Sequence, residues 1–169
     1  MASRTAWTAG NGVGYTWTTA ISGNDMTASG VTGLANGSSV VASATITNQT
    51  AQDIFADLSV RCQIASSTIA AGANLAFWLY ALLDDGSTYG DGQFTAGTAA
   101  AKTPTFSPIG VVPLVAAAAQ TLLIGFVQGI IIPPGSFKFA VQNNSGFSFT
   151  STAAQQNVLY RTYNTNLNN

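Results

Sequence analysis

Residues 75–83 read LAFWLYALL and are followed directly by the sequence DDG at 84–86. An uncharged run rich in aromatic and branched side chains is typical of a β-strand, and Asp and Gly are common in the turn that ends one. Side chains of a strand point alternately to its two faces, so Trp78, Tyr80 and Leu82 share one face. The opposite face is also apolar. The stretch therefore predicts a strand that needs a cover on both faces.

The sequence on either side of this strand continues as short strands separated by turns. Residues 58–64 alternate strictly, with Leu58, Val60, Cys62 and Ile64 separated by polar side chains. This alternation predicts a strand with one buried face. Further strands are expected at 40–46, at 120–128, which is again apolar on both faces, at 137–142 and at 158–163.

Signals for α-helices are poor throughout the chain. Apart from residues 115–121, which include four consecutive alanines, no window shows a 3.6-residue apolar stripe with a cap. No repeat of fixed period is present, which disfavours a propeller or solenoid. A chain of 169 residues with about eight short strands predicts an all-β, single-domain β-sandwich, most closely a jelly roll of about eight strands, with a barrel as the alternative.

The composition excludes several classes of function. The chain has no histidine and no glutamate, and only 7% of its residues are charged. Histidine, glutamate and lysine supply most general acids and bases at neutral pH, so we expect no enzyme and no catalytic residues. The five basic residues are scattered and the net charge is −1, which disfavours nucleic-acid binding. Residues 111–132 are interrupted by proline, glycine and glutamine, which favours buried strands over a membrane span.

The first 36 residues differ in composition from the rest of the chain. They are rich in Gly, Thr, Ser and Asn and contain Trp7, Tyr15 and Trp17 as isolated aromatic residues. Such a sequence orders poorly by itself, and its aromatic side chains need a surface on which to dock. We therefore expect residues 1–36 to form an extended N-terminal arm or first strand, and residues 37–169 to form the sandwich. The arm packs on its own domain or reaches a neighbouring one.

Residues 84–92, DDGSTYGDG, form the densest polar cluster of the chain. Asp84, Asp85 and Asp91 supply oxygen ligands of the kind that Ca²⁺ takes, but their spacing does not match an EF-hand loop. A pair of carboxylates for glycoside hydrolysis is the best enzymatic interpretation of the same residues. Asp and Gly are also the ordinary residues of turns. We expect a structural turn with no metal and no cofactor.

The strands that are apolar on both faces indicate where other molecules bind. One face of residues 75–83 is covered by the opposing sheet. The other is covered by the N-terminal arm, by a loop of the same chain or by another subunit, and the sequence leaves these three alternatives open. The interface candidates are Trp7, Tyr15, Trp17, Trp78, Tyr80 and Leu82. A homo-oligomer follows from this interpretation, with a trimer favoured and a dimer as the alternative.

Three features together resemble a known family: the polar N-terminal arm, the stretch FWLYALLDDGSTYGDG, and the later run IIIPPGSFKFAVQNNSG. They are similar to the small jelly-roll decoration, or cement, proteins of tailed-bacteriophage heads, and the resemblance covers roughly residues 40–163. It carries no catalytic signature.

The resemblance implies a structural virion protein on the capsid exterior, made in the host cytoplasm. It would act as a homo-oligomer seated over junctions between capsomers of the major capsid protein, and would hold the shell against internal pressure. Neither nucleic acid nor membrane is an expected partner. The alternative is a glycan- or receptor-binding β-sandwich module of a phage fibre, in which exposed Trp and Tyr would form a platform for a sugar.

Overall fold

The computed structural model describes residues 4–9, 17–21, 39–64, 69–83, 88–89, 99–101, 107–115, 122–150 and 156–168. These residues form strands and connecting turns. The strands are β1 (Arg4–Ala9), β2 (Thr18–Ile21), β3 (Ser39–Ala42), β4 (Ile46–Thr47), β5 (Phe55–Gln63), β6 (Asn74–Ala81), β7 (Ala99–Ala101), β8 (Gly110–Pro113), β9 (Leu122–Ile131), β10 (Ser136–Asn144) and β11 (Asn157–Asn168). Among the described residues there is no helix long and apolar enough to cross a bilayer.

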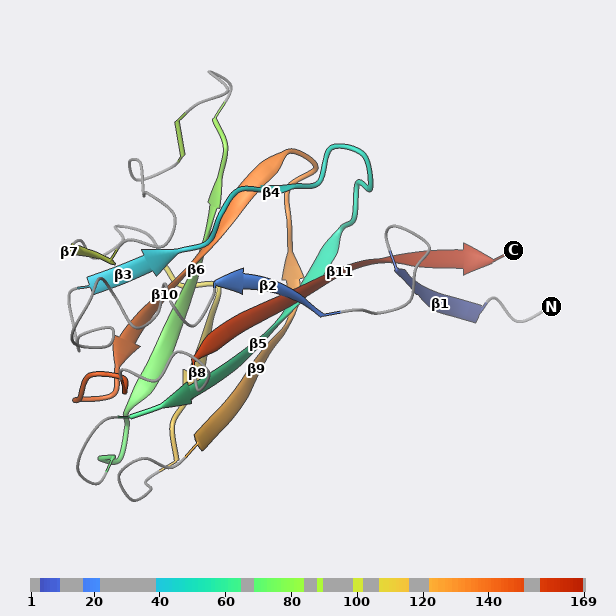
Figure 1. Ribbon diagram of the computed structural model, residues 1–169. Helices are drawn as coiled ribbons and strands as arrows, with labels where there is room; N and C mark the ends of the chain where they lie inside the picture. Colours follow the sequence, from blue (N-terminus) through green and yellow to red (C-terminus); the bar gives the residue numbers. More distant parts are fainter. Residues whose placement is uncertain are drawn as a thin grey trace.

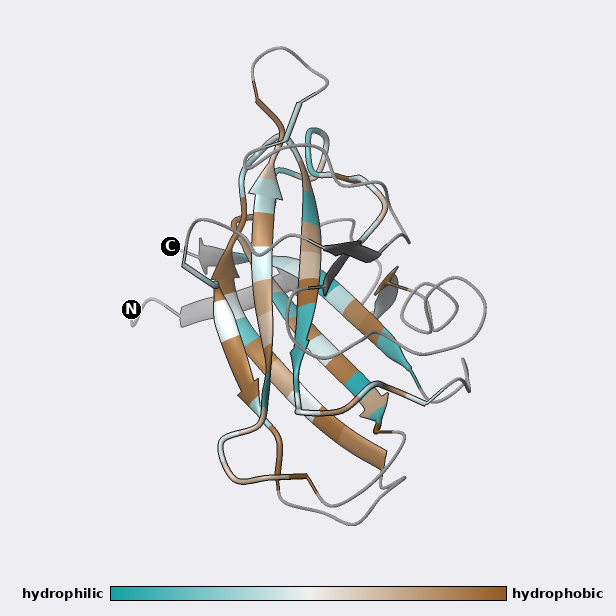
Figure 2. Cartoon of the chain, turned by 90° about the vertical axis from the view of Figure 1, so that its left-hand side faces the viewer, coloured by the Kyte–Doolittle hydropathy of each residue, from teal (hydrophilic) through white to brown (hydrophobic). Residues whose placement is uncertain are grey.

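The strands form two antiparallel sheets that pack face to face. Sheet A has the order β1-β11-β5-β9, and β2 also pairs with β11. Sheet B has the order β7-β3-β10-β6-β8, and β4 also pairs with β10. Figure 2 shows one sheet in front of the other, with their strands crossing. The prediction of an all-β sandwich is therefore confirmed.

The strand pairs are nested along the sequence. β2 pairs with β11, β3 with β10, β5 with β9 and β6 with β8. The first and third of these pairs lie in sheet A, and the second and fourth lie in sheet B. The chain therefore behaves like a long antiparallel ribbon whose successive segments fold onto alternate sheets.

The main core lies between the two sheets. On β5 the even-numbered side chains point inward, and Leu58, Val60 and Cys62 are almost completely buried, as their alternation predicts. Phe77 of β6, together with Phe137 of β10, meets them from sheet B. The lone cysteine, which the sequence analysis treats as a small apolar side chain, is a free thiol in this core.

The outer face of sheet B carries a second, smaller core. Trp78 and Tyr80 are only 4% and 1% exposed, and they cluster with Ala42, Tyr89 and Ala140. The Tyr89 hydroxyl lies 2.8 Å from the Thr45 hydroxyl oxygen. These aromatic side chains are buried within a single chain, which explains how β6 can be apolar on both faces.

Part of the N-terminal region belongs to sheet A. Ile21 of β2 is fully buried in the main core, and Ala20 is nearly so. β1 instead pairs with the far half of β11, from Arg4 opposite Asn168 to Ala9 opposite Tyr163. Figure 1 shows β1 and the end of β11 as a two-stranded ribbon that projects from the body and carries both termini.

Candidate functional site

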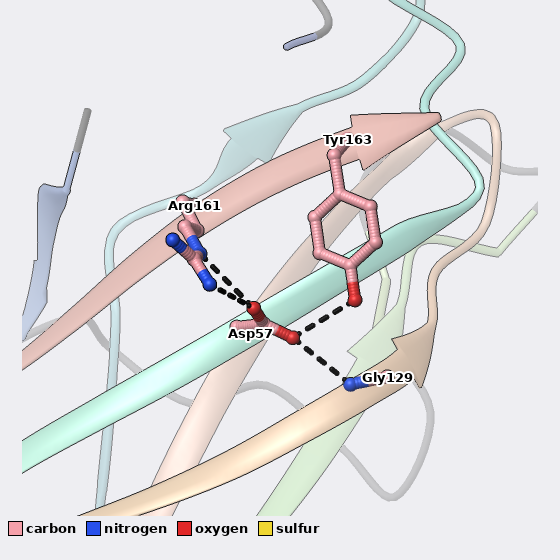
Figure 3. A network of polar contacts seen from close by, with 4 residues as sticks. All are labelled: Asp57, Gly129, Arg161 and Tyr163. Atoms are coloured by element: carbon pink, nitrogen blue, oxygen red, sulfur yellow. Dashed lines mark hydrogen bonds and ion pairs between the residues drawn. The ribbon is translucent and has the colours of Figure 1, made fainter. Parts of the chain in front are cut away.

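The outer face of sheet A carries a buried polar network centred on Asp57 of β5. The Arg161 guanidinium donates to Asp57 Oδ2 from Nε at 3.0 Å and from Nη2 at 2.7 Å. Asp57 Oδ1 accepts a bond of 2.9 Å from the Tyr163 hydroxyl and one of 3.0 Å from the Gly129 backbone N–H. Figure 3 shows these groups reaching the carboxylate of Asp57 on β5 from the two neighbouring strands, β11 and β9. The network therefore ties β9, β5 and β11 together.

The partners of Asp57 determine its protonation. Burial by itself would raise the pKa of this carboxyl, but the bonds from Gly129, Arg161 and Tyr163 outweigh it and hold the pKa below its ordinary value. Burial, with the bond to Asp57 adding to it, raises the pKa of Tyr163 to about 12. A carboxylate that is ionised and fully bonded at neutral pH is a poor proton acceptor, so the network is suited to structure and not to acid–base chemistry.

Trp17 lies across the outer face of the same sheet. Its ring is 4.7 Å from the Arg161 guanidinium carbon, which is cation–π distance, and 6.3 Å from the ring of Phe126 on β9. Trp17 is half-buried. The residue just before β2 therefore connects the polar network to the apolar side chains of the edge strand.

Most of the exposed apolar side chains gather where β8 and β9 form the free edges of the two sheets. Among the described residues, eight large apolar side chains are exposed, and six of them lie on β8, just after it, or on β9. Ile131 lies at the far end of β9, and we call the other five the β8–β9 rim: Val111, Val115, Leu122, Ile124 and Phe126. The exposed fractions of these five range from 37% to 75%. Most of the large exposed apolar side chains in the described part of the chain therefore lie on or next to these two strands.

A small apolar hollow lies at this rim. It has a volume of about 40 Å³, and its lining includes Val112, Val115, Leu123 and Ile124. The two sheets approach closely beside it because two glycines have no side chain: a Cβ on Gly125 would meet the side chain of Val112, and one on Gly110 would meet Val127. The rim therefore follows the open edge of the sandwich, with Val111 on the outer face of sheet B and Ile124 and Phe126 on the outer face of sheet A.

A larger cavity of about 350 Å³ lies beside the turn before β5. Ile46, Asn48, Asp53 and Tyr160 are among the residues that line it. Asp53 is buried, and among the described residues neither of its carboxylate oxygens has a hydrogen-bond partner. The same oxygens are sealed from solvent, so a ligand in the cavity would not reach them in this conformation. The backbone of Asp53 is held by the Asn48 side chain, which donates to its carbonyl at 2.8 Å and accepts from its N–H at 2.9 Å.

The predicted interface residues do not form one surface. Trp78 and Tyr80 lie in the second core, and Leu82 packs partly buried against it. Trp17 lies on the outer face of sheet A, on the opposite side of the sandwich. Trp7 is on β1 of the projecting ribbon, and Tyr15 is outside the described residues.

Asp84, Asp85 and Asp91 also fall outside the described residues, so their predicted turn stays a prediction. In the described parts of the chain, no three Cys, Asp or Glu side chains come together as metal ligands. Burial raises the pKa of the Cys62 thiol to about 12, which makes it a poor nucleophile at neutral pH.

The sequence does not mark Val111 and Val115 as surface residues. Residues 120–128, predicted to be apolar on both faces, carry the signal that leads to Leu122, Ile124 and Phe126. Identifying the rim also needs the strand order, because the sequence does not say which strands lie at the edges.

The chain was compared with protein families, curated proteins and solved structures. It matches no family model, no curated protein and no solved structure.

Proposed function

We propose that this chain is a structural virion protein that decorates the outside of an icosahedral phage head. In this role it binds the major capsid protein as a homo-oligomer and stabilises contacts between capsomers. The observation that carries the proposal is the β8–β9 rim, an uncharged apolar surface on a sandwich whose described polar groups are suited to structure and not to catalysis. Exposed apolar patches of this kind mark surfaces that bind other proteins.

The strand order supports the jelly-roll description that is part of the proposal. A jelly roll is a folded antiparallel ribbon of eight principal strands in two sheets, and capsid proteins are among those that use it. The nested pairs β2–β11, β3–β10, β5–β9 and β6–β8, which alternate between the sheets, fit that ribbon. Such a body is stiff, as a clamp between capsomers needs to be.

The projecting ribbon supports the predicted role of the N-terminal arm. β1 and the last residues of β11 extend beyond the sandwich, and their sequences contain Trp7 together with neutral residues such as Asn166 and Asn168. A large aromatic residue among neutral polar ones is a composition that favours protein contacts over contacts with nucleic acid. We place the capsid-binding segment of the proposal on this ribbon.

A non-catalytic role is part of the same proposal. Asp57 uses both carboxylate oxygens in structural bonds, and Cys62 is buried in the core. Aspartate and cysteine are residue types that serve as catalytic bases and nucleophiles, and here the Asp57 oxygens are occupied and the Cys62 thiol is enclosed. The second buried aspartate, Asp53, has its carboxylate oxygens sealed from solvent. The environment of these side chains supports a protein that acts by binding.

The test uses the purified full-length chain and expanded heads of the phage that encodes it, prepared without this protein. We expect the protein to co-sediment with the heads at a fixed number of copies per capsomer and to raise the temperature at which they release DNA. Failure to bind the heads, together with binding on a carbohydrate array, would favour the glycan-binding alternative and overturn the proposal.

A further inference from the structure

We propose that β9 pairs, edge to edge and antiparallel, with β9 of a second copy of this chain, so that sheet A continues across a two-fold axis. The inference deepens the proposed function, because it assigns a surface to the self-association that the function includes. It rests on the backbone, the side chains and the charge of the β8–β9 rim.

The backbone of β9 has an unused edge. One side of the strand pairs with β5 from Leu122 opposite Gln63 to Ile131 opposite Phe55. Within the described ranges, no strand pairs with its other side. An edge of this length presents alternating N–H and C=O groups that match a second antiparallel strand.

The strand lacks most of the features that usually protect an edge from pairing. Edge strands are commonly blocked by lysine, by proline, by a β-bulge or by being very short. β9 has an irregularity where its register with β5 shifts between Ala56 and Leu58, but residues 122–127 pair with β5 without a shift. β9 has ten residues, and Leu122–Gly135 contains no charged residue, with its prolines only after the strand. β8, in contrast, has four residues and ends at Pro113. Of the two free edges at the rim, β9 is the one open to a partner strand.

The side chains favour a second copy over a charged partner. Ile124 and Phe126 point to the same outer face, and an antiparallel two-fold pairing centred on Gly125 places Ile124 of each copy across from Phe126 of the other. Branched and aromatic side chains in cross-strand contact stabilise a sheet. Because the strand carries no charge, self-pairing brings no like charges together, and an acidic or basic partner would find nothing to recognise.

The exposed apolar side chains beside the β9 edge supply about half of the area that a stable dimer needs. Four of the rim residues, Val115, Leu122, Ile124 and Phe126, together expose on the order of 400 Å² of apolar surface, whereas Val111 faces the outer side of sheet B. A stable interface buries about 800 Å² on each partner, so the β9 main chain and the neighbouring outer face of sheet A have to supply the rest. The sequence analysis favoured a trimer, whereas pairing of identical antiparallel edges closes as a dimer.

Light scattering of the full-length chain over about 1–100 µM tests the inference. We expect a mass of twice 17.3 kDa that is insensitive to salt, because no ion pair holds the interface. Ile124→Lys and Val115→Lys, both at the rim, should return the mass to that of one chain. Ile54→Lys is the matched control, since Ile54 is 49% exposed but lies outside the rim.

A second measurement covers the case in which a lysine variant fails to fold. In hydrogen exchange of the unmodified chain, dilution should deprotect those amides of β9 that point away from β5, while the other amides of β9 and those of β5 and β11 stay protected. A monomer at every concentration, a mass of three times 17.3 kDa, or a dimer that persists in both folded rim variants would overturn the inference. A trimer that binds heads would overturn only this inference, whereas a dimer that does not bind heads would overturn only the proposed function.

Discussion

Asp57 on β5 and Arg161 on β11 form a two-bond ion pair on the outer face of sheet A, at 3.0 and 2.7 Å. The carboxylate is buried, whereas the Arg161 side chain remains 28% exposed. The two residues are neighbours only because β11 pairs with β5 in a register that sets Arg161 opposite Asp57. The ion pair can therefore form only when β11 and β5 of sheet A are paired in this register.

The first prediction concerns Asp57→Asn. The new amide would present N–H groups to donors from Arg161, Tyr163 or Gly129 and would leave at least one of them without an acceptor. We expect a loss of on the order of 3 kcal/mol, or a melting temperature lower by about 6–12 °C, with the exposure of Arg161 keeping the loss moderate. Thermal unfolding followed by circular dichroism measures it. A variant that melts within 1–2 °C of the unmodified chain, or about 0.5 kcal/mol, would contradict the structural role.

The second prediction is the acid dependence that follows from the same carboxyl. The pKa of Asp57 in the folded chain lies below its ordinary value of 3.8. A group with a lowered folded pKa stabilises the protein above its unfolded pKa, and this contribution is lost as the pH falls below 3.8 toward the folded value. Urea unfolding between about pH 7 and pH 2 should therefore show a fall in stability that is smaller in Asp57→Asn. Equal slopes in the two proteins would show that Asp57 does not contribute.

The third prediction makes the same substitution at the other buried aspartate. Among the described residues, the Asp53 carboxylate has no hydrogen-bond partner, so burying it brings a cost without a compensating bond. Asp53→Asn keeps the shape of the side chain and leaves the backbone bonds to Asn48 in place. We expect the stability to be unchanged or raised by up to about 1 kcal/mol, opposite in sign to Asp57→Asn. A loss as large as that of Asp57→Asn would indicate a partner for Asp53.

Local patterns in the sequence predicted the central strands well. The alternation of residues 58–64 and the apolar run 75–83 correspond to β5 and β6. Both signals lie in neighbouring residues, because successive side chains of a strand point to opposite faces and their polarity follows their burial. β2 was harder to predict. Its sequence TTAI is short and has no period, and Ile21 becomes a core residue only because β11 lies beside it. The boundary predicted at residue 36 follows a change in composition, and composition does not show which strands pair in the folded chain.

The polar network and the rim were not predictable in the same way. Asp57, Arg161, Tyr163 and Gly129 come from three strands separated by up to 106 positions, and nothing local in the sequence marks them as partners. What covers Trp78 was not predictable either. The sequence indicates that the face of the strand with Trp78 is covered, but it does not indicate which segment or subunit covers it. These contacts are determined by the order and pairing of the strands, which composition alone does not indicate.

The fourth prediction concerns the close approach of the two sheets at the rim. Gly125→Ala places a methyl group against Val112, and in a packed interior this costs about 1–3 kcal/mol. Gly135→Ala is the matched control, because a Cβ there meets nothing within 4 Å. Adding Val112→Ala to Gly125→Ala should recover part of the loss relative to the sum of the two single variants, which a double-mutant cycle of unfolding free energies measures. Strict additivity would show that the two residues do not meet.

The last prediction separates the two parts of the N-terminal region. Deleting residues 1–10 removes β1 and its pairing with the end of β11, but no described core residue lies in that segment. We expect its melting temperature to stay close to that of the full chain while binding to phage heads weakens, since the proposed function places capsid contacts on this ribbon.

Deleting residues 1–22 additionally removes β2. Because Ile21 is fully buried and pairs with Val158, this deletion opens the core along β11. Ile21→Ala in the full chain should by itself cost about 2–5 kcal/mol, and the longer deletion should cost at least as much. Circular dichroism melts of the three proteins make the comparison. If the short deletion destabilised the chain as much as the long one, β1 would belong to the folding unit and would not be a separable arm.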